Sequence, residues 1–116
     1  MSKEKRDYIL YLEDILDALE KIESYTKNIS FAEFTNNDMA VDAVIRNFEV
    51  IGEATKNVPE EIKEEYPEVE WKEATGFRNV LIHDYFGIDL EAVWDTIKKN
   101  LLPFKEQHIL KVLTAK

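Results

Sequence analysis

Cysteine is absent from this sequence, and glycine and proline are scarce, with three of each among 116 residues. Without cysteine there is no disulfide framework and no thiolate chemistry, which fits a reducing compartment. Glycine and proline supply most tight turns, so their scarcity argues against a fold of many short strands. The composition therefore favours a helical protein over a disulfide-stapled or all-β one.

Long apolar runs are missing as well. Residues 1–7 are mostly charged and no apolar segment follows them, so we expect no signal peptide. Elsewhere the apolar residues never run unbroken far enough to cross a bilayer. We therefore expect a cytoplasmic protein that does not enter a membrane. The length predicts a single domain over residues 1–116, large enough to bury a core without disulfides or a metal.

Charge is unevenly distributed along the chain. Fifteen basic and twenty-four acidic residues give a net charge of −9, and such a surface repels phosphates. This argues against a protein that coats nucleic acid, but it leaves room for a small basic site. Residues 60–73 contain seven Glu and two Lys, whereas residues 90–116 contain five Lys and three acidic residues. If the protein binds RNA, the Glu-rich segment 60–73 should face away from it.

Apolar residues recur at intervals of three and four, which is the period of an amphipathic helix, and no stretch alternates with the period of a strand. Residues 36–38 and Asp89 are good N-cap signals, and Pro59 suits a first helical turn. The connection 26–35 has a weak pattern, in which residues 31–34 could form a turn. The expected helices cover residues 5–25, 39–57, 60–65, 71–83 and 90–101, with a last segment starting at Pro103. We predict an all-α, antiparallel up-and-down bundle of four main helices with additional short helices.

Several familiar kinds of site are missing from the sequence. It has no Gly-rich phosphate loop and no Cys or His spacing typical of a metal site, and its two histidines make no defensible Ser-His-Asp arrangement. The Glu pairs at 60–61 and 64–65 could be metal ligands, but a charged run of this kind is usually a solvated helix face. We therefore expect no metal site and no cofactor.

The most informative segment is Arg78-Asn79-Val80-Leu81-Ile82-His83-Asp84-Tyr85. On a helix, Arg78 and Tyr85 share one face, and Asn79 and His83 share the next, about 100° away. Arginine binds phosphate oxygens through its planar fork, and histidine exchanges protons near neutral pH. RNA cleavage needs a base for the 2′-hydroxyl, an acid for the 5′-oxygen and cations on the phosphate. One such His per chain therefore favours a site shared by two copies of a homodimer.

Each of these residues also has a purely structural interpretation. A histidine near a helix end, such as His83, often caps a carbonyl group or lies half exposed. Tyr85 could be an aromatic residue at the edge of the core, and Asp84 could pair with a nearby basic residue. His108 has no partner in the sequence, and we interpret it as structural or exposed. The residue pattern alone therefore leaves both catalysis and packing open for residues 78–85.

The form Arg-x-x-x-x-His-x-Tyr of residues 78–85 resembles the signature of the HepT-type proteins of the HEPN superfamily. The resemblance extends from Tyr8 to about Lys111. Other segments similar to the family pattern are residues 42–46, 51–54, 76–79, 88–89 and 93–94, together with Trp71. The short motif is moderately specific by itself, and the ordered set of segments is much more specific.

The resemblance implies a dimer of helical bundles in which both motifs line one cleft. It implies a metal-independent endoribonuclease that leaves a 2′,3′-cyclic phosphate, with Arg78 and His83 as the catalytic pair and Asn79 as a supporting residue. Glu53 is carried over as a polar residue near the cleft. HepT-type proteins are toxins of prokaryotic toxin–antitoxin pairs, so a nucleotidyltransferase antitoxin is implied as a partner. It would neutralise the toxin by binding it or by transferring AMP to Tyr85.

Two other functions remain open at this point. The chain could be a non-catalytic helical partner and modification substrate of a nucleotidyltransferase, with little or no nuclease activity. It could also be a helical dimer with a structural role. Growth arrest that depends on His83 would separate the ribonuclease toxin from both of these alternatives.

Overall fold

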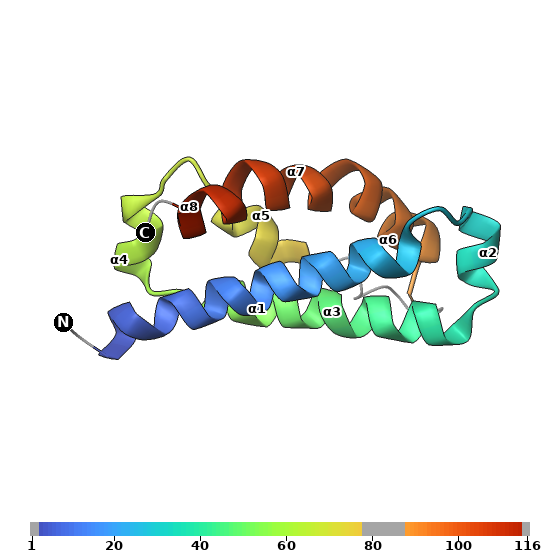
Figure 1. The fold of residues 1–116 in the computed structure, drawn as a ribbon, viewed down its shortest axis with the longest axis horizontal. Helices are drawn as coiled ribbons and strands as arrows, with labels where there is room; N and C mark the ends of the chain where they lie inside the picture. Colours follow the sequence, from blue (N-terminus) through green and yellow to red (C-terminus); the bar gives the residue numbers. More distant parts are fainter. Residues whose placement is uncertain (1–2, 78–87, 115–116) are drawn as a thin grey trace.

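The computed structural model describes residues 3–77 and 88–114, and its longest helices are α1 (Lys3–Thr26) and α3 (Asp38–Asn57). They run antiparallel and contact each other along their length (Figure 1). Their apolar residues recur every three or four positions, so each helix buries one continuous face. Fully buried side chains on these faces include Leu12, Ile15, Ile22, Phe48 and Ile51. The predicted helices 5–25 and 39–57 are confirmed.

A short helix, α2 (Phe31–Thr35), lies in the connection between α1 and α3, where the sequence showed only a weak pattern. A capping box fixes its start, because the Glu33 backbone N–H donates to Ser30 Oγ at 3.1 Å and the Ser30 N–H donates to Glu33 Oε1 at 2.9 Å. The next helix, α3, is capped by Asn37, whose Oδ1 accepts from the Ala40 N–H at 3.1 Å. The predicted cap within residues 36–38 is therefore confirmed.

Two further short helices follow, α4 (Glu60–Glu65) and α5 (Trp71–Thr75). Pro59 precedes α4, as predicted from its fixed backbone angle. The Trp71 indole N–H donates to the Tyr66 carbonyl at 2.9 Å, which ties the start of α5 to the loop before it. The predicted helix 71–83 thus begins where expected. The structure describes it through Phe77, and residues 78–83 lie outside the described residues.

One unbroken helical run forms the C-terminal part of the bundle. It consists of α6 (Leu90–Thr96), the π-helical turn η2 (Ile97–Leu101), α7 (Leu102–Phe104), the π-helical turn η3 (Lys105–Ile109) and α8 (Leu110–Thr114). The prediction that Pro103 starts a separate segment is wrong, because Pro103 lies inside this run. Proline lacks an N–H and clashes with the carbonyl four residues earlier. The wide turns on both sides of Pro103 fit this constraint without breaking the helix.

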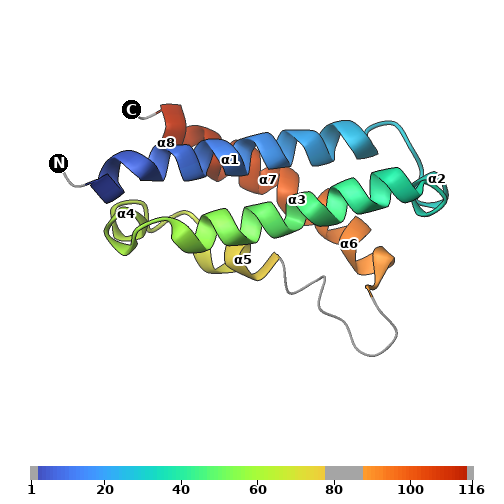
Figure 2. The same cartoon turned by 90° about the horizontal axis from the view of Figure 1, so that it is seen from below.

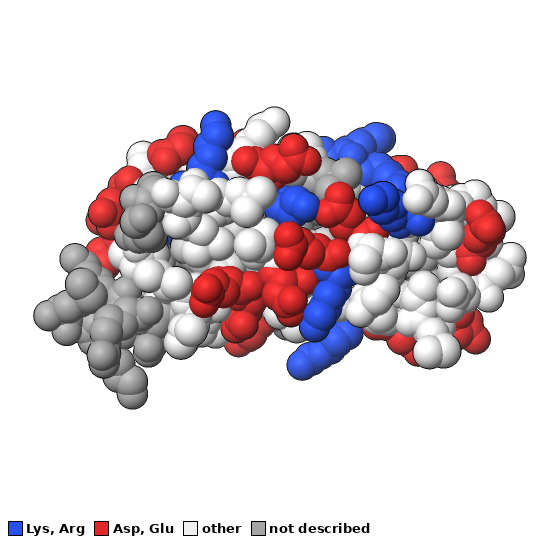
Figure 3. Space-filling model, viewed as in Figure 1, with Lys and Arg blue, Asp and Glu red and all other residues white. Residues whose placement is uncertain are grey.

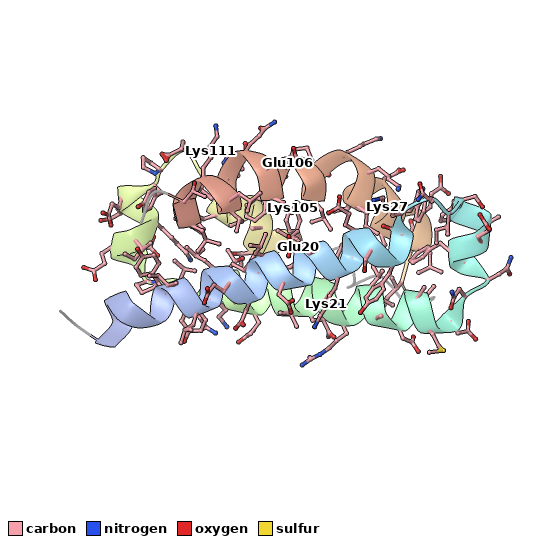
Figure 4. All side chains as sticks on the ribbon, viewed as in Figure 1. Glu20, Lys21, Lys27, Lys105, Glu106 and Lys111 are labelled. Carbon is pink, nitrogen blue, oxygen red and sulfur yellow. The ribbon has the colours of Figure 1, made fainter. Side chains whose placement is uncertain are left out.

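The C-terminal run lies over the α1–α3 pair and contacts α1 directly (Figure 1). Both α5 and α6 lie on the same flank of α3 (Figure 2). The helix α1 runs antiparallel to both α3 and the C-terminal run (Figure 1), and the prediction of an all-α helical bundle is confirmed. Lys105 Nζ is 2.7 Å from Glu23 Oε1 and ties the run to α1, toward which it points (Figure 4). Among the described residues, no helix has the length and apolar character needed to cross a membrane.

Candidate functional site

The predicted catalytic motif falls between two parts of the chain that the structure describes. The first part ends at Phe77 and the second begins at Ile88. Arg78, Asn79, His83 and Tyr85, as well as Asp84 between them, lie outside the described residues, so their roles stay predictions. What the structure does define is how the bundle holds the two residues on either side of the motif.

Phe77 is held on the N-terminal side of the motif. Gly76 caps α5, and its backbone N–H donates to the carbonyl groups of Lys72 and Ala74. Phe77 is only 4% exposed, and its ring meets the Phe104 ring edge to face, with centroids 5.7 Å apart and an interplanar angle of 88°. Edge-to-face contacts of this kind add directional preference to the burial of apolar area. The residue immediately before Arg78 is therefore part of the core.

The C-terminal side of the motif is held by different means. Ile88 is half buried and packs against the core. Asp89 caps α6, because its Oδ1 accepts from the backbone N–H groups of Glu91 and Ala92 at 3.0 and 3.2 Å. This confirms the predicted cap.

A polar contact lies beside Phe77, between α5 and the C-terminal run. The Asn100 side-chain amide donates to Glu73 Oε1 at 3.0 Å. A hydrogen bond with the Glu70 carboxyl group raises the pKa of Glu73 above its ordinary 4.5, and partial burial adds to this, while Asn100 and the nearby His108 oppose it. The neighbouring Glu70 carboxyl group is therefore the main cause of the raised pKa of Glu73.

His108 lies near this polar contact and also contacts Phe104. Its ring lies against Phe104 with centroids 5.7 Å apart, and the residue is half buried. Its Nδ1 atom is buried and has no hydrogen-bond partner in the part of the chain that the structure describes. The structural interpretation of His108 fits this position, but the sequence did not predict its contact with Phe104 and, through Phe104, its link to Phe77. The spacing of Asn100, Phe104 and His108, four residues apart, was the signal that could have found this link.

Glu53 is exposed on α3. It lines a groove of about 360 Å³ between α1 and α3, together with Tyr11, Asp14, Arg46 and Glu49. This groove offers both signs of charge and a phenol. Because the motif lies outside the described residues, the predicted place of Glu53 near the catalytic cleft stays a prediction.

The Glu-rich segment forms one side of a larger, open groove of about 1220 Å³ between α4 and α5. Glu60, Glu64, Glu70 and Glu73 lie on its edges and are all exposed, which confirms that this segment is a solvated face. Among the described residues, no three His, Asp or Glu side chains are grouped to hold a metal ion. On the face shown in Figure 3, acidic and basic side chains are interspersed, so that face presents no broad basic surface to phosphates.

The fold is a small helical bundle, and the family match of the sequence places it in a class of ribonucleases. The chain belongs to the ribonuclease HepT-like family, whose model matches residues 15–109. Because the chain belongs to this family, it is a ribonuclease and therefore an enzyme. The match includes the whole of the segment Arg78–Tyr85.

Named relatives agree with this assignment. The chain is 44% identical over 101 residues to the "Probable ribonuclease HepT" of Thermococcus cleftensis, covering 87% of this chain and 92% of that protein. It is 45% identical over 114 residues to the "Putative RNase MJ1216" of Methanocaldococcus jannaschii, covering 97% and 94%. It is 41% identical over 103 residues to the "Putative RNase TTE0752" of Caldanaerobacter subterraneus subsp. tengcongensis, covering 89% and 91%. No solved structure matches the chain.

Proposed function

We propose that this protein is a metal-independent endoribonuclease in which Arg78 and His83 act at a cleft between two copies of the chain. The observation that carries the proposal is the family match over residues 15–109, which contains both of these residues in the spacing Arg-x-x-x-x-His. The relatives that bear ribonuclease names cover most of the chain as well.

The chemistry needs no metal ion, because the nucleophile is the 2′-hydroxyl group of the RNA itself. One His83 accepts the 2′-hydroxyl proton as the 2′-oxygen forms a bond to phosphorus. The bond from phosphorus to the 5′-oxygen breaks, and an acid returns a proton to that oxygen. Arg78 stabilises the negative charge on the two non-bridging oxygens. The products are a 2′,3′-cyclic phosphate and a free 5′-hydroxyl group.

A homodimer supplies the second histidine. His108, the other histidine of each chain, is half buried against Phe104. The acid and the base are therefore proposed to be His83 from each of two copies related by a two-fold axis, with Asn79 as a supporting residue. Glu53 is proposed to lie near the cleft of this dimer.

We further propose that the protein is the toxin of a toxin–antitoxin pair and that a nucleotidyltransferase antitoxin neutralises it. The antitoxin would bind the toxin, or transfer AMP from ATP to the Tyr85 hydroxyl group. In that transfer the tyrosine oxygen, having lost its proton, forms a bond to the α-phosphorus as pyrophosphate leaves. AMP joined to the tyrosine oxygen as a phosphodiester would add negative charge and bulk two turns from Arg78 on a helix, where the substrate phosphate belongs. Because tyrosine ordinarily has a pKa near 10, the transferase would have to activate the hydroxyl group.

Cleavage of a mixed-sequence RNA in the presence of EDTA tests this function. Wild-type protein should cleave the RNA and leave cyclic phosphate ends, and Arg78→Ala and His83→Ala should lower the rate at least about a hundredfold. Arg78→Lys should also be poor, because a point charge cannot replace the planar fork. Loss of cleavage in EDTA, or full activity of His83→Ala, would contradict the mechanism. An inert wild type that still receives AMP would favour the role of a non-catalytic modification substrate.

A further inference from the structure

The contact between Phe77 and Phe104 lies at the point where the described chain reaches the motif. Phe77 and Phe104 are 4% and 3% exposed, and their rings meet edge to face. Arg78 is the next residue after Phe77 in the sequence. Whatever holds the backbone of Phe77 therefore also fixes one end of the peptide bond to Arg78.

Three side chains of the C-terminal run, spaced four residues apart, lie at or near the contact between Phe77 and Phe104. Asn100 bonds to Glu73, Phe104 packs on Phe77, and His108 packs on Phe104. In a regular α-helix, each step of four residues turns by about 40°, so Asn100 and His108 would differ by about 80°. The wider turns at 97–101 and 105–109 reduce this rotation and keep the three side chains closer to one line.

We propose that Phe104 is a positioning residue of the ribonuclease, which fixes the start of the catalytic motif by clamping Phe77, with the Glu73–Asn100 hydrogen bond as a second point of attachment. The proposal rests on the proposed function, in which Arg78 holds the substrate phosphate. An arginine fork loses its geometry when its backbone shifts, and a displacement of about 1 Å is enough to cost a large part of the rate.

His108 supports the clamp through its ring. Its buried Nδ1 atom makes no hydrogen bond among the described residues, and leaving such an atom unpaired costs free energy. His108 therefore contributes to this part of the core through the contact of its ring with Phe104, and not through a hydrogen bond of its Nδ1 atom. On this basis His108 adds a second ring contact to Phe104 and limits the movement of that ring.

The chain offers a matched control for Phe104. Phe34 is fully buried and packs against another aromatic ring, Trp94, but it lies in α2, and among the described residues it has no ring contact with Phe77. Phe104→Leu and Phe34→Leu both replace a buried ring by an aliphatic side chain and lose a ring contact. A general loss of packing affects both variants, whereas a loss of positioning affects Phe104→Leu alone.

Steady-state cleavage of a short fluorescent RNA by the full-length chain provides the test. We expect Phe104→Leu to lower kcat about tenfold or more with KM nearly unchanged, and Phe34→Leu to leave both constants close to wild type below its melting temperature. Phe77→Leu should resemble Phe104→Leu, and the double variant should be no slower than either single variant, because each breaks the same contact. His108→Ala should lower kcat by a few fold, and His108→Phe, which keeps a ring, should restore it.

The outcomes separate this proposal from the proposed function. If wild-type protein cleaves RNA and Phe104→Leu cleaves equally fast, or if Phe34→Leu loses as much kcat, the clamp is wrong and the ribonuclease mechanism stands. If wild-type protein does not cleave RNA, the proposed function fails, and amide hydrogen exchange decides on the clamp. Exchange at Ala74–Phe77 should then be faster in Phe104→Leu and unchanged in Phe34→Leu, and equal rates in all three proteins would overturn the clamp.

Discussion

The α1–α3 pair and the contact between α5 and the C-terminal run are stabilised in different ways. The α1–α3 pair buries regular apolar faces and begins α3 with an asparagine cap. The second contact combines one hydrogen bond and one aromatic contact with a helical run that has two π-helical turns and a ring contact of its own, between Phe104 and His108. Apolar packing tolerates small changes of position, whereas hydrogen bonds and ring edges require defined geometry. The precise contact lies next to the motif, and the tolerant one supports the rest of the bundle.

The largest effect should come from the centre of the α1–α3 pair. Phe48 is fully buried on α3, so Phe48→Ala should lower the free energy of unfolding by about 3–5 kcal/mol. Leu10 on α1 is 58% exposed, and Leu10→Ala should change the same quantity by less than about 0.5 kcal/mol. Urea denaturation followed by circular dichroism measures both. A loss below about 1.5 kcal/mol for Phe48→Ala would show that this pair is not the main source of stability.

A smaller effect should come from the ion pair that joins the two regions. The Lys105 side chain is 13% exposed and that of Glu23 is 38% exposed, with Nζ and Oε1 2.7 Å apart. Lys105→Met removes the charge-assisted hydrogen bond and should lower the free energy of unfolding by about 1–2 kcal/mol at pH 7. The Lys21–Asp17 pair is the control, because its side chains are 52% and 65% exposed, and Lys21→Met should cause no measurable loss. Equal effects of the two substitutions would contradict the importance of burial here.

The contribution of Lys105 should depend on pH in a defined direction. The hydrogen bond to Glu23 raises the pKa of Lys105 above its ordinary 10.5, against the opposing effect of burial. A raised lysine pKa means that the stabilisation is complete below pH 10.5 and is lost as the pH rises through the raised value. The difference in stability between wild type and Lys105→Met should therefore shrink above pH 10.5. A difference that stays constant to pH 12 would show that the lost contact was apolar, not ionic.

The smallest effect should come from the carboxyl pair beside Phe77. The pKa of Glu73 is raised above 4.5, first by its hydrogen bond with Glu70. The folded state then binds a proton more readily than the unfolded state, so a penalty appears as the pH rises from 4.5 through the raised value. Glu73→Gln removes this penalty and keeps an oxygen for Asn100. It should raise the melting temperature slightly at pH 7 and lose this advantage near pH 4, and a lower melting temperature at pH 7 would contradict the interpretation.

Much of the fold could be predicted from the sequence because local signals agreed with the final packing. The caps at Asn37 and Asp89 and the position of Pro59 were readable, since each acts through the backbone within one helical turn. The short helix α2 was missed, because five residues give too little periodicity to detect, although Ser30 and Glu33 form a capping box.

The continuity of the C-terminal run could not be predicted from local rules. Proline ordinarily ends or starts a helix, but the run continues through Pro103, with π-helical turns on both sides of it and buried neighbours at Leu101 and Phe104. Phe77 pairs with Phe104, and Glu73 pairs with Asn100. In both pairs the partners are 27 residues apart in the sequence. Such contacts depend on how helices pack, which periodicity does not specify. The residue types of the candidate site were readable, but their neighbours in space were not.

The link between Lys105 and Glu23 also has a consequence for the order of folding, since it joins residues 82 positions apart. Contacts between residues so far apart in the sequence close a large loop. They form late because the chain must lose the conformational entropy of that loop before the contacts stabilise the structure. The α1–α3 pair is closer in sequence and can form first. Loss of the ion pair in Lys105→Met should then speed unfolding and leave the folding rate nearly unchanged, as stopped-flow denaturation would measure. The C-terminal run, and Phe104 with it, would join the bundle last and leave it first.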